Sequence, residues 1–328
     1  MTSKSQLTRR SLIKALATST VAVGLGAAAA PGALASTATA ADPLTTAANG
    51  RLVPPGKIGI QLYSIRDKVS SLGFRTVFEQ LADIGYTEIE FAGYTQGQVG
   101  AITPEEIRQL LDDNGLRAVG SHVGIGALRT DLARQLEIAN ILGMPHVGTA
   151  NAPSNVATVD GYRAAADEFN AWGAQANAAG LKLYQHNHAG EFAFASDQPD
   201  VRLYDVFFDN TDPDAVFLEM DVYWAFVGQH LYPGFEPIDY VRNHAHRYPL
   251  LHLKDGARNE ANPNGFDIIE FDAGDLPYRE FLRATKARGT RWGIWEQDNA
   301  ATTAVPPNPL DSFGNARRSY DGILGLRG

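Results

Sequence analysis

The chain has 328 residues, of which 44% are hydrophobic and 20% are charged, and it contains no cysteine. This is the composition of a folded globular protein, and the length suffices for a large core without disulfides or structural metals. Without cysteine, disulfide scaffolds, thiolate metal sites and cysteine nucleophiles are excluded. The formal net charge of −9 argues against a partner with a phosphate backbone, so we expect no nucleic-acid partner.

The first 41 residues have the pattern of an export signal. Residues 8–14, Thr-Arg-Arg-Ser-Leu-Ile-Lys, resemble the twin-arginine motif, and a weakly apolar run follows over residues 15–30. Small-residue cleavage patterns then end at Ala35 and Ala40. The apolar run is too short and too interrupted for a spanning helix. We therefore expect residues 1–41 to be a cleaved Tat signal peptide of a secreted, periplasmic or cell-envelope protein that has no membrane contact afterwards.

The signal also changes the charge of the exported protein. It holds four basic residues and no acidic one: Lys4, Arg9, Arg10 and Lys14. Its removal leaves 24 basic and 37 acidic residues, a net charge of −13. Residues 42–56, with Pro43, Gly50, Pro54 and Pro55, are expected to form a linker.

Eight short apolar runs follow at intervals of about thirty residues, as expected of strands that alternate with helices. These predicted strands cover residues 58–63, 88–91, 117–122, 146–150, 181–187, 216–221, 250–253 and 292–296. Between them, apolar spacing and end signals predict helices. Phe74 to Ile84 ends at Gly85, Thr103-Pro104-Glu105-Glu106 begins a helix, and Leu132 to Leu142 ends at Gly143. Further helical stretches are 169–179, 240–246, 278–287 and 320–326.

Eight strand–helix units predict an α/β fold, a (β/α)8 TIM barrel over residues 57–328. The competing doubly wound sheet would carry a glycine-rich turn after its first strand, whereas here Gln61-Leu62-Tyr63-Ser64 follows. A long connection over residues 256–274, rich in Asn, Gly and Pro, is expected to be either a lid or a surface excursion.

Polar residues gather where the predicted strands end, which is where barrel enzymes place their chemistry. They are Gln61, Tyr63, His122, Asn151, His186, His188, Glu191, Glu219, Asp221, His252, Lys254, Glu296, Gln297 and Asp298. Carboxylates and imidazoles that converge at one mouth favour a divalent ion such as Mn²⁺, Co²⁺, Mg²⁺ or Zn²⁺. Glu219, which alternates with Asp221, also fits a core residue bonded to a neighbour.

Four stretches resemble the sugar phosphate isomerase/epimerase family, the xylose isomerase-like TIM barrels. They are residues 184–192 (YQHNHAGEF), 218–224 (LEMDVYW), 251–255 (LHLKD) and 295–298 (WEQD). The resemblance spans nearly the whole chain after the signal, and its HNH…E pattern is similar to that of inosose dehydratases and enzymes that act on 3-keto-glycosides. It implies one divalent ion on strands five to eight, with Asp221, His252 and Glu296 as three ligands. Glu191 is the expected fourth ligand, with His186 as the alternative.

The resemblance also implies the chemistry, which is removal of a proton beside a carbonyl through a metal-stabilised enediolate. Proton return gives an isomerase or epimerase of keto sugars, whereas loss of a β-substituent gives a lyase or dehydratase. Glu191 and Glu296 are the expected acid and base. His186, His188 and Lys254 are expected to assist them. Expected substrate contacts are Gln61, Tyr63, His122, Asn151 and Trp224.

Two other classes compete with a sugar isomerase or lyase. An endonuclease on a related barrel would need more histidine ligands and a basic face, which a net charge of −13 opposes. A sugar-binding protein without activity would be expected to lose a ligand, yet three clear ones remain. A small carbohydrate is therefore the expected partner. A homo-oligomer and a partner sugar oxidoreductase that makes the ketone are compatible with the sequence.

Overall fold

The computed structural model describes residues 50–286, 292–302 and 311–328, and the predicted signal peptide lies outside them. Eight parallel strands form the centre of the described part. They are β1 (Ile58–Gln61), β2 (Glu88–Phe91), β3 (Arg117–Ser121), β4 (His146–Thr149), β5 (Lys182–His186), β6 (Val216–Asp221), β7 (Leu250–Leu253) and β10 (Trp292–Trp295). Each of the eight predicted strands is present, and each end differs from the prediction by two residues at most.

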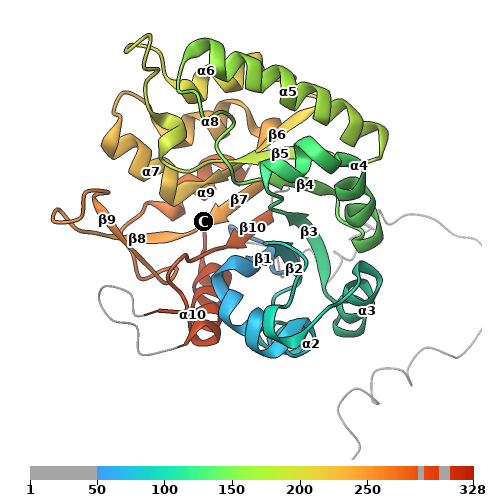
Figure 1. Ribbon diagram of the computed structural model, residues 1–328. Coiled ribbons are helices and arrows are strands. Elements are labelled where there is room, and N and C mark those ends of the chain that lie inside the picture. The colour runs from blue at the N-terminus through green and yellow to red at the C-terminus, as the bar shows by residue number, and fades with distance from the viewer. Residues whose placement is uncertain (1–49, 287–291, 303–310) are drawn as a thin grey trace, which may run out of the picture. The chain divides into compact units, whose positions relative to one another are not determined.

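The strands follow one another around a nearly closed barrel in the order β3-β2-β1-β10-β7-β6-β5-β4. The remaining gap between β3 and β4 is bridged by the pairing of His122 with Gly148, and the Val123 N–H donates to the Gly148 carbonyl at 2.7 Å. Figure 1 shows the helices surrounding this ring of strands. The predicted TIM barrel is therefore confirmed.

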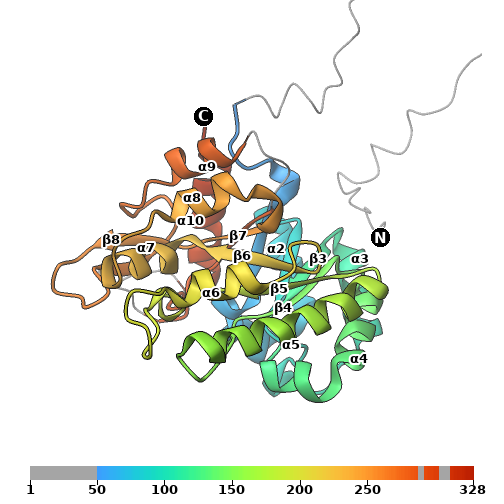
Figure 2. The ribbon, with the colours of Figure 1, turned by 90° about the horizontal axis from the view of Figure 1, so that it is seen from above.

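Helices on the outside separate the strands and shield them from solvent. They are α2 (Arg66–Ile84), α3 (Pro104–Asn114), α4 (Ile125–Leu142), α5 (Val159–Ala178), α6 (Leu203–Asn210), α7 (Val222–Leu231), α8 (Pro237–Asn243), α9 (Tyr278–Lys286) and α10 (Ser312–Gly325). Figure 2 shows α5 along the outside of β4 and β5. No helix of the described residues combines the length and the hydrophobicity needed to cross a bilayer.

Local signals set several helix ends, as the sequence predicted. Thr103 and Glu106 form a reciprocal capping box at the start of α3, and Gly143 ends α4 in the left-handed conformation. The helices predicted over 169–179 and 320–326 are only the C-terminal parts of α5 and α10, which begin earlier at side-chain caps from Thr158 and Asp311. Helices α6 and α7 were not predicted.

The long connection after β7 contains an ordered hairpin of β8 (Asp255–Arg258) and β9 (Phe266–Ile269). The Asp255 carboxylate accepts backbone N–H groups from Gly256, Asp272 and Gly274 at 2.8 to 3.2 Å, which ties the two ends of the segment together. The Tyr223 hydroxyl of α7 donates to the Phe266 carbonyl at 3.2 Å, and Figure 1 shows the hairpin beside α7.

Some residues expected in the linker belong to the packed structure. Leu52 and Val53 are buried, and the Leu52 N–H donates to the Leu326 carbonyl at 3.2 Å. The two ends of the described chain therefore meet at the barrel.

Candidate metal centre

Strand register brings the predicted ligands side by side. Asp221 at the end of β6 pairs with His252 of β7, and His186 at the end of β5 pairs with Glu219 of β6. Glu296 directly follows β10, which pairs with β7 on its other side. Because parallel strands end at the same edge, four neighbouring strands deliver carboxylates and imidazoles to one mouth of the barrel.

Four of these side chains form a compact donor group, which we call the outer group: His186, Asp221, His252 and Glu296. Their donor atoms all lie within 4.8 Å of one another, and all four residues are buried. His252 Nδ1 lies 2.9 Å from Glu296 Oε2 and 3.9 Å from Asp221 Oδ2, and His186 Nε2 lies 3.8 Å from the same Asp221 oxygen.

The outer group fits a divalent ion in the chemistry of its donor atoms. Two imidazoles and two carboxylates are a donor set suited to Mn²⁺, Co²⁺ or Zn²⁺. Asp221 Oδ2 is completely buried and faces both imidazoles, and the Lys254 ammonium lies 3.0 Å from it. A buried carboxylate oxygen of this kind normally has a donor or a cation as its partner.

Lys254 is the positive charge beside the outer group. Its ammonium lies 2.8 Å from Glu296 Oε2, 3.0 Å from Asp221 Oδ2 and 3.1 Å from Asp298 Oδ2, although the side chain has no exposed surface. Burial alone would lower the pKa of Lys254, but the three carboxylates hold it well above its usual value. The ammonium is therefore charged at the mouth of the barrel.

Beneath the outer group lies an inner layer of Glu90, Glu219 and His122. Glu219 Oε2 lies 2.9 Å from His122 Nε2, 3.2 Å from His186 Nδ1 and 3.2 Å from His252 Nε2. Glu90 Oε2 lies 2.6 Å from His252 Nε2 and accepts Gln61 Nε2 at 3.0 Å. Both carboxylates are fully buried, so each depends on these donors in place of water.

Tyr184 of β5 completes the inner layer from inside the barrel. Its hydroxyl donates to Glu90, and its ring needs the space left by a glycine. A side chain at Gly120 would place its Cβ 2.9 Å from the Tyr184 hydroxyl oxygen, so β3 accepts only glycine here without a shift of its neighbour.

Burial and neighbouring charges lower the pKa values of His186 and His188 and raise that of His252. Burial and the field of Lys254 lower the pKa of His188 to about 4, and burial and His252 lower that of His186 well below its usual value. For His252 burial has the same effect, but Glu219, Glu90 and Glu296 outweigh it and raise the pKa well above 6.5.

Of the two candidates for the strand-five ligand, His186 belongs to the outer group and Glu191 does not. Glu191 lies in a short 3₁₀ turn, Gly190–Phe192, where its carboxylate accepts the backbone N–H of His188 at 3.0 Å. Burial raises the pKa of Glu191 to about 7. The turn holds this carboxylate outside the outer group, while strand alternation aims His186 into the mouth.

A cavity of about 380 Å³ opens over the outer group. It is lined by Tyr63, Ala92, His122, Ala150, His186, His188, Glu296 and Asp298. Of the predicted substrate contacts, Tyr63 and His122 therefore line the cavity. Gln61 does not, because it is fully buried, with its amide nitrogen on Glu90 and its oxygen on the Tyr63 N–H. Trp224 packs beside the cavity wall, with its ring 5.8 Å from that of His188.

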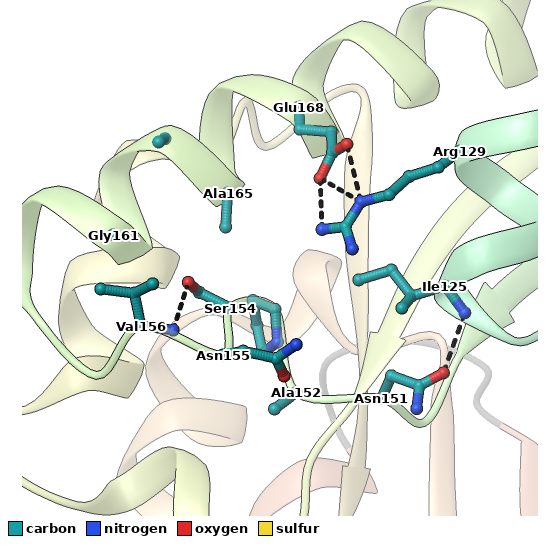
Figure 3. Close-up of a pocket in the computed structure, with 12 residues that line it drawn as sticks. Ile125, Arg129, Asn151, Ala152, Ser154, Asn155, Val156, Gly161, Ala165 and Glu168 are labelled. Atoms are coloured by element: carbon teal, nitrogen blue, oxygen red, sulfur yellow. Dashed lines mark hydrogen bonds and ion pairs between the residues drawn. The ribbon is translucent and has the colours of Figure 1, made fainter.

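A second hollow of about 570 Å³ lies beside the first, between α4 and α5. Figure 3 shows residues that line it, among them Arg129 of α4 and Glu168 of α5, which form an ion pair at 2.8 Å. Asn151 lines this hollow, and its side-chain oxygen accepts the Ile125 N–H at 2.9 Å. The two hollows are adjacent, because Ala150 lines one and Asn151 lines the other.

Glu90 is the site residue that sequence reasoning missed. The signal was present, because Glu88-Ile89-Glu90 places two carboxylates inside a strand that was expected to be buried. Glu88 is neutralised by Arg117, whereas Glu90 points to histidines. Asp298, one of the polar residues at the predicted strand ends, both lines the cavity and contacts Lys254.

Residues 78–315 match the family of xylose isomerase-like TIM barrels, and the chain belongs to this family. An inosose dehydratase from Geobacillus kaustophilus is 24% identical over 233 residues, which cover 62% of this chain and 71% of the dehydratase. This relative fits the subgroup that the HNH…E pattern resembles.

Solved structures share the fold. A sugar phosphate isomerase/epimerase from Parabacteroides distasonis superposes with a TM-score of 0.66 at 23% identity, over 83% of this chain and 96% of that one. The probable 3-DHS dehydratase from Bacillus anthracis superposes with a TM-score of 0.57 at 11% identity, over 81% and 97% of the two chains.

Proposed function

We propose that the protein is an exported, metal-dependent sugar isomerase or epimerase that acts on a keto sugar or a related polyol. The outer group carries this proposal, because two imidazoles and two carboxylates converge under a cavity of about 380 Å³ at the carboxyl ends of the strands. The relatives include an isomerase/epimerase and dehydratases, and the chemistry common to these reactions is proton removal beside a carbonyl.

In this proposal His186, Asp221, His252 and Glu296 would hold the divalent ion. When bound, such an ion supplies a Lewis acid that makes the proton beside a carbonyl more acidic. The remaining residues supply the proton chemistry and the binding of the sugar. Lys254 offers a permanent positive charge within reach of a developing oxyanion, because its ammonium lies at the same carboxylate oxygens.

His188 is the proton acceptor that the cavity favours. It lines the cavity, and a pKa of about 4, set by burial and Lys254, keeps its imidazole neutral near pH 7, with a lone pair on one ring nitrogen. Asp298 also lines the cavity and can hydrogen-bond a substrate hydroxyl. Glu191, expected as an acid or base, has its carboxylate occupied by the N–H of His188.

A lyase on the same scaffold is the second candidate, and two observations favour it. The inosose dehydratase relative is named for such an elimination. The second hollow, of about 570 Å³, is lined by Asn151, the residue after Ala150 of the cavity wall, and in this proposal it would receive a leaving group larger than water. A 3-keto-glycoside would need a sugar oxidoreductase to supply its ketone.

One experiment tests both candidates. Metal analysis of the purified protein is combined with proton exchange in D₂O, using a panel of ketoses and 3-keto-glycosides, with His252→Ala as the control. We expect about one divalent ion per chain and deuterium beside the carbonyl with wild type only. The product then separates isomerase from lyase. Wild-type protein without metal and without exchange would refute the proposed function.

A further inference from the structure

The two imidazoles of the outer group contact the inner layer through opposite ring nitrogens. His186 uses Nδ1, which lies 3.2 Å from Glu219 Oε2, and leaves Nε2 toward Asp221. His252 uses Nε2, which lies 2.6 Å from Glu90 Oε2, and leaves Nδ1 toward Glu296 at 2.9 Å. The inner carboxylates therefore contact Nδ1 of one ring and Nε2 of the other.

An ionised carboxylate only accepts hydrogen bonds, so the ring nitrogen beside it must carry the proton. A neutral imidazole has one such proton, and its other nitrogen is then a lone pair free for a metal. By this reasoning Glu219 selects the Nδ1–H form of His186 and frees Nε2. Glu90 holds a proton on Nε2 of His252, while Nδ1 faces Glu296 at 2.9 Å, where a bound ion would take the place of a proton.

We propose that Glu219 and Glu90 are positioning residues that hold a proton on Nδ1 of His186 and on Nε2 of His252, so that the opposite nitrogens, Nε2 of His186 and Nδ1 of His252, are presented to an ion in the outer group. This inference rests on the proposed metal centre. It adds two residues from outside the ligand set, and one of them stands on β2, a strand that contributes no ligand to that set.

The inner carboxylates are themselves held in place, which is what such a role requires. Glu90 is fixed by the Gln61 amide at 3.0 Å and by the Tyr184 hydroxyl. Glu219 is fixed by His122 Nε2 at 2.9 Å. Both carboxylates are fully buried, so water does not compete for the imidazole protons, and a flip of either ring would cost an inner carboxylate one of its donors.

The direct test reads the tautomers by NMR. The full chain is labelled with ¹⁵N-histidine and loaded with Zn²⁺, and long-range ¹H–¹⁵N correlations identify the protonated nitrogen of each ring. His186 and His252 are assigned by single substitutions to asparagine. We expect His186 to be protonated on Nδ1 and His252 on Nε2. Two rings in the same tautomer, or the reverse assignment, would overturn the inference.

Metal affinity gives a second readout that does not depend on turnover. Calorimetric titration with Zn²⁺ is expected to show affinity reduced about 10- to 100-fold in Glu219→Gln and in Glu90→Gln. Glu88→Gln is the matched control, because Glu88 is also a buried carboxylate of β2 but pairs with Arg117. Its affinity is expected to equal that of wild type.

The outcomes separate this inference from the proposed function. Wild-type protein that binds no divalent ion refutes the metal centre and the inference with it. Wild-type protein that binds Zn²⁺, with unchanged affinity in both inner-layer variants, refutes the inference alone. If Glu219→Gln does not fold, the wild-type tautomers still decide.

Discussion

Glu191 allows a sharp test of the electrostatics around the candidate site. Its carboxyl group is only 3% exposed, and burial raises its pKa from the usual 4.5 to about 7. Each unit of difference between the native and unfolded pKa values corresponds to about 1.4 kcal/mol in the free energy of unfolding. The ionised carboxylate should therefore cost about 3 kcal/mol of stability above pH 7.

The direction of the pH dependence of stability follows from the pH range in which the native and unfolded states bind different numbers of protons. Below about pH 4.5 both hold the proton, so Glu191 causes no pH dependence. Between about pH 4.5 and 7 the unfolded chain has lost the proton and the native state keeps it, so the stability of wild type falls as the pH rises. Above pH 7 both are ionised, and the full cost remains.

Glu191→Gln removes the charge and keeps an oxygen for the His188 N–H. Its free energy of unfolding relative to wild type should therefore increase by up to about 3 kcal/mol between pH 5 and pH 8. Urea denaturation at four pH values measures the difference. Glu137→Gln, at an exposed position on α4, removes the same formal charge and should show no such trend. Parallel pH curves for wild type and Glu191→Gln would refute the buried ionisation.

Three further predictions concern the proposed centre and export. His252→Ala and Glu296→Gln should each remove metal binding and turnover but keep the barrel, as metal analysis, activity assays and circular dichroism can show; full activity in both would exclude the metal assignment. Lys254→Met leaves three carboxylates without their cation and should destabilise the metal-free protein by about 3–5 kcal/mol. Thermal melts should show that Zn²⁺ raises the melting temperature of this variant more than that of wild type, and equal shifts would contradict it. Arg9→Lys with Arg10→Lys should leave uncleaved precursor inside the cell, whereas export of the double variant, detected by fractionation and immunoblotting, would contradict the Tat assignment.

The fold could be predicted from the sequence because the signals for its strands and helix ends are local. Each barrel strand is a short apolar run between helix ends, and the capping box at Thr103 and the glycine at 143 mark those ends directly. The β8–β9 hairpin could not be predicted in the same way. The Asp255 carboxylate beside it accepts N–H groups from Asp272 and Gly274, which lie farther along the chain. No local sequence pattern indicates that contact.

The sequence predicted only those site residues that the order of the strands brings together. Asp221, His252 and Glu296 end neighbouring strands, so their convergence could be predicted. Whether His186 or Glu191 joins the outer group could not be predicted from the sequence. It depends on a 3₁₀ turn in which the Glu191 carboxylate accepts a backbone N–H. Glu90 was missed because its partner His252 is 162 positions away, and only the closed barrel brings β2 and β7 to the same interior.

The charges of the centre also explain how its residues divide the chemistry. Glu90, Glu219 and Asp221 are fully buried and Glu296 nearly so, while Lys254, which is also buried, contacts Asp221 and Glu296. Burial disfavours this excess of negative charge, and it raises the pKa of Glu90 together with the field of Glu219. A divalent ion would place two positive charges at these oxygens. His188 stands outside this carboxylate cluster, so its pKa stays at about 4 through burial and Lys254. In the proposed mechanism, one environment would thus keep Lys254 charged beside a developing oxyanion and His188 neutral as the proton acceptor.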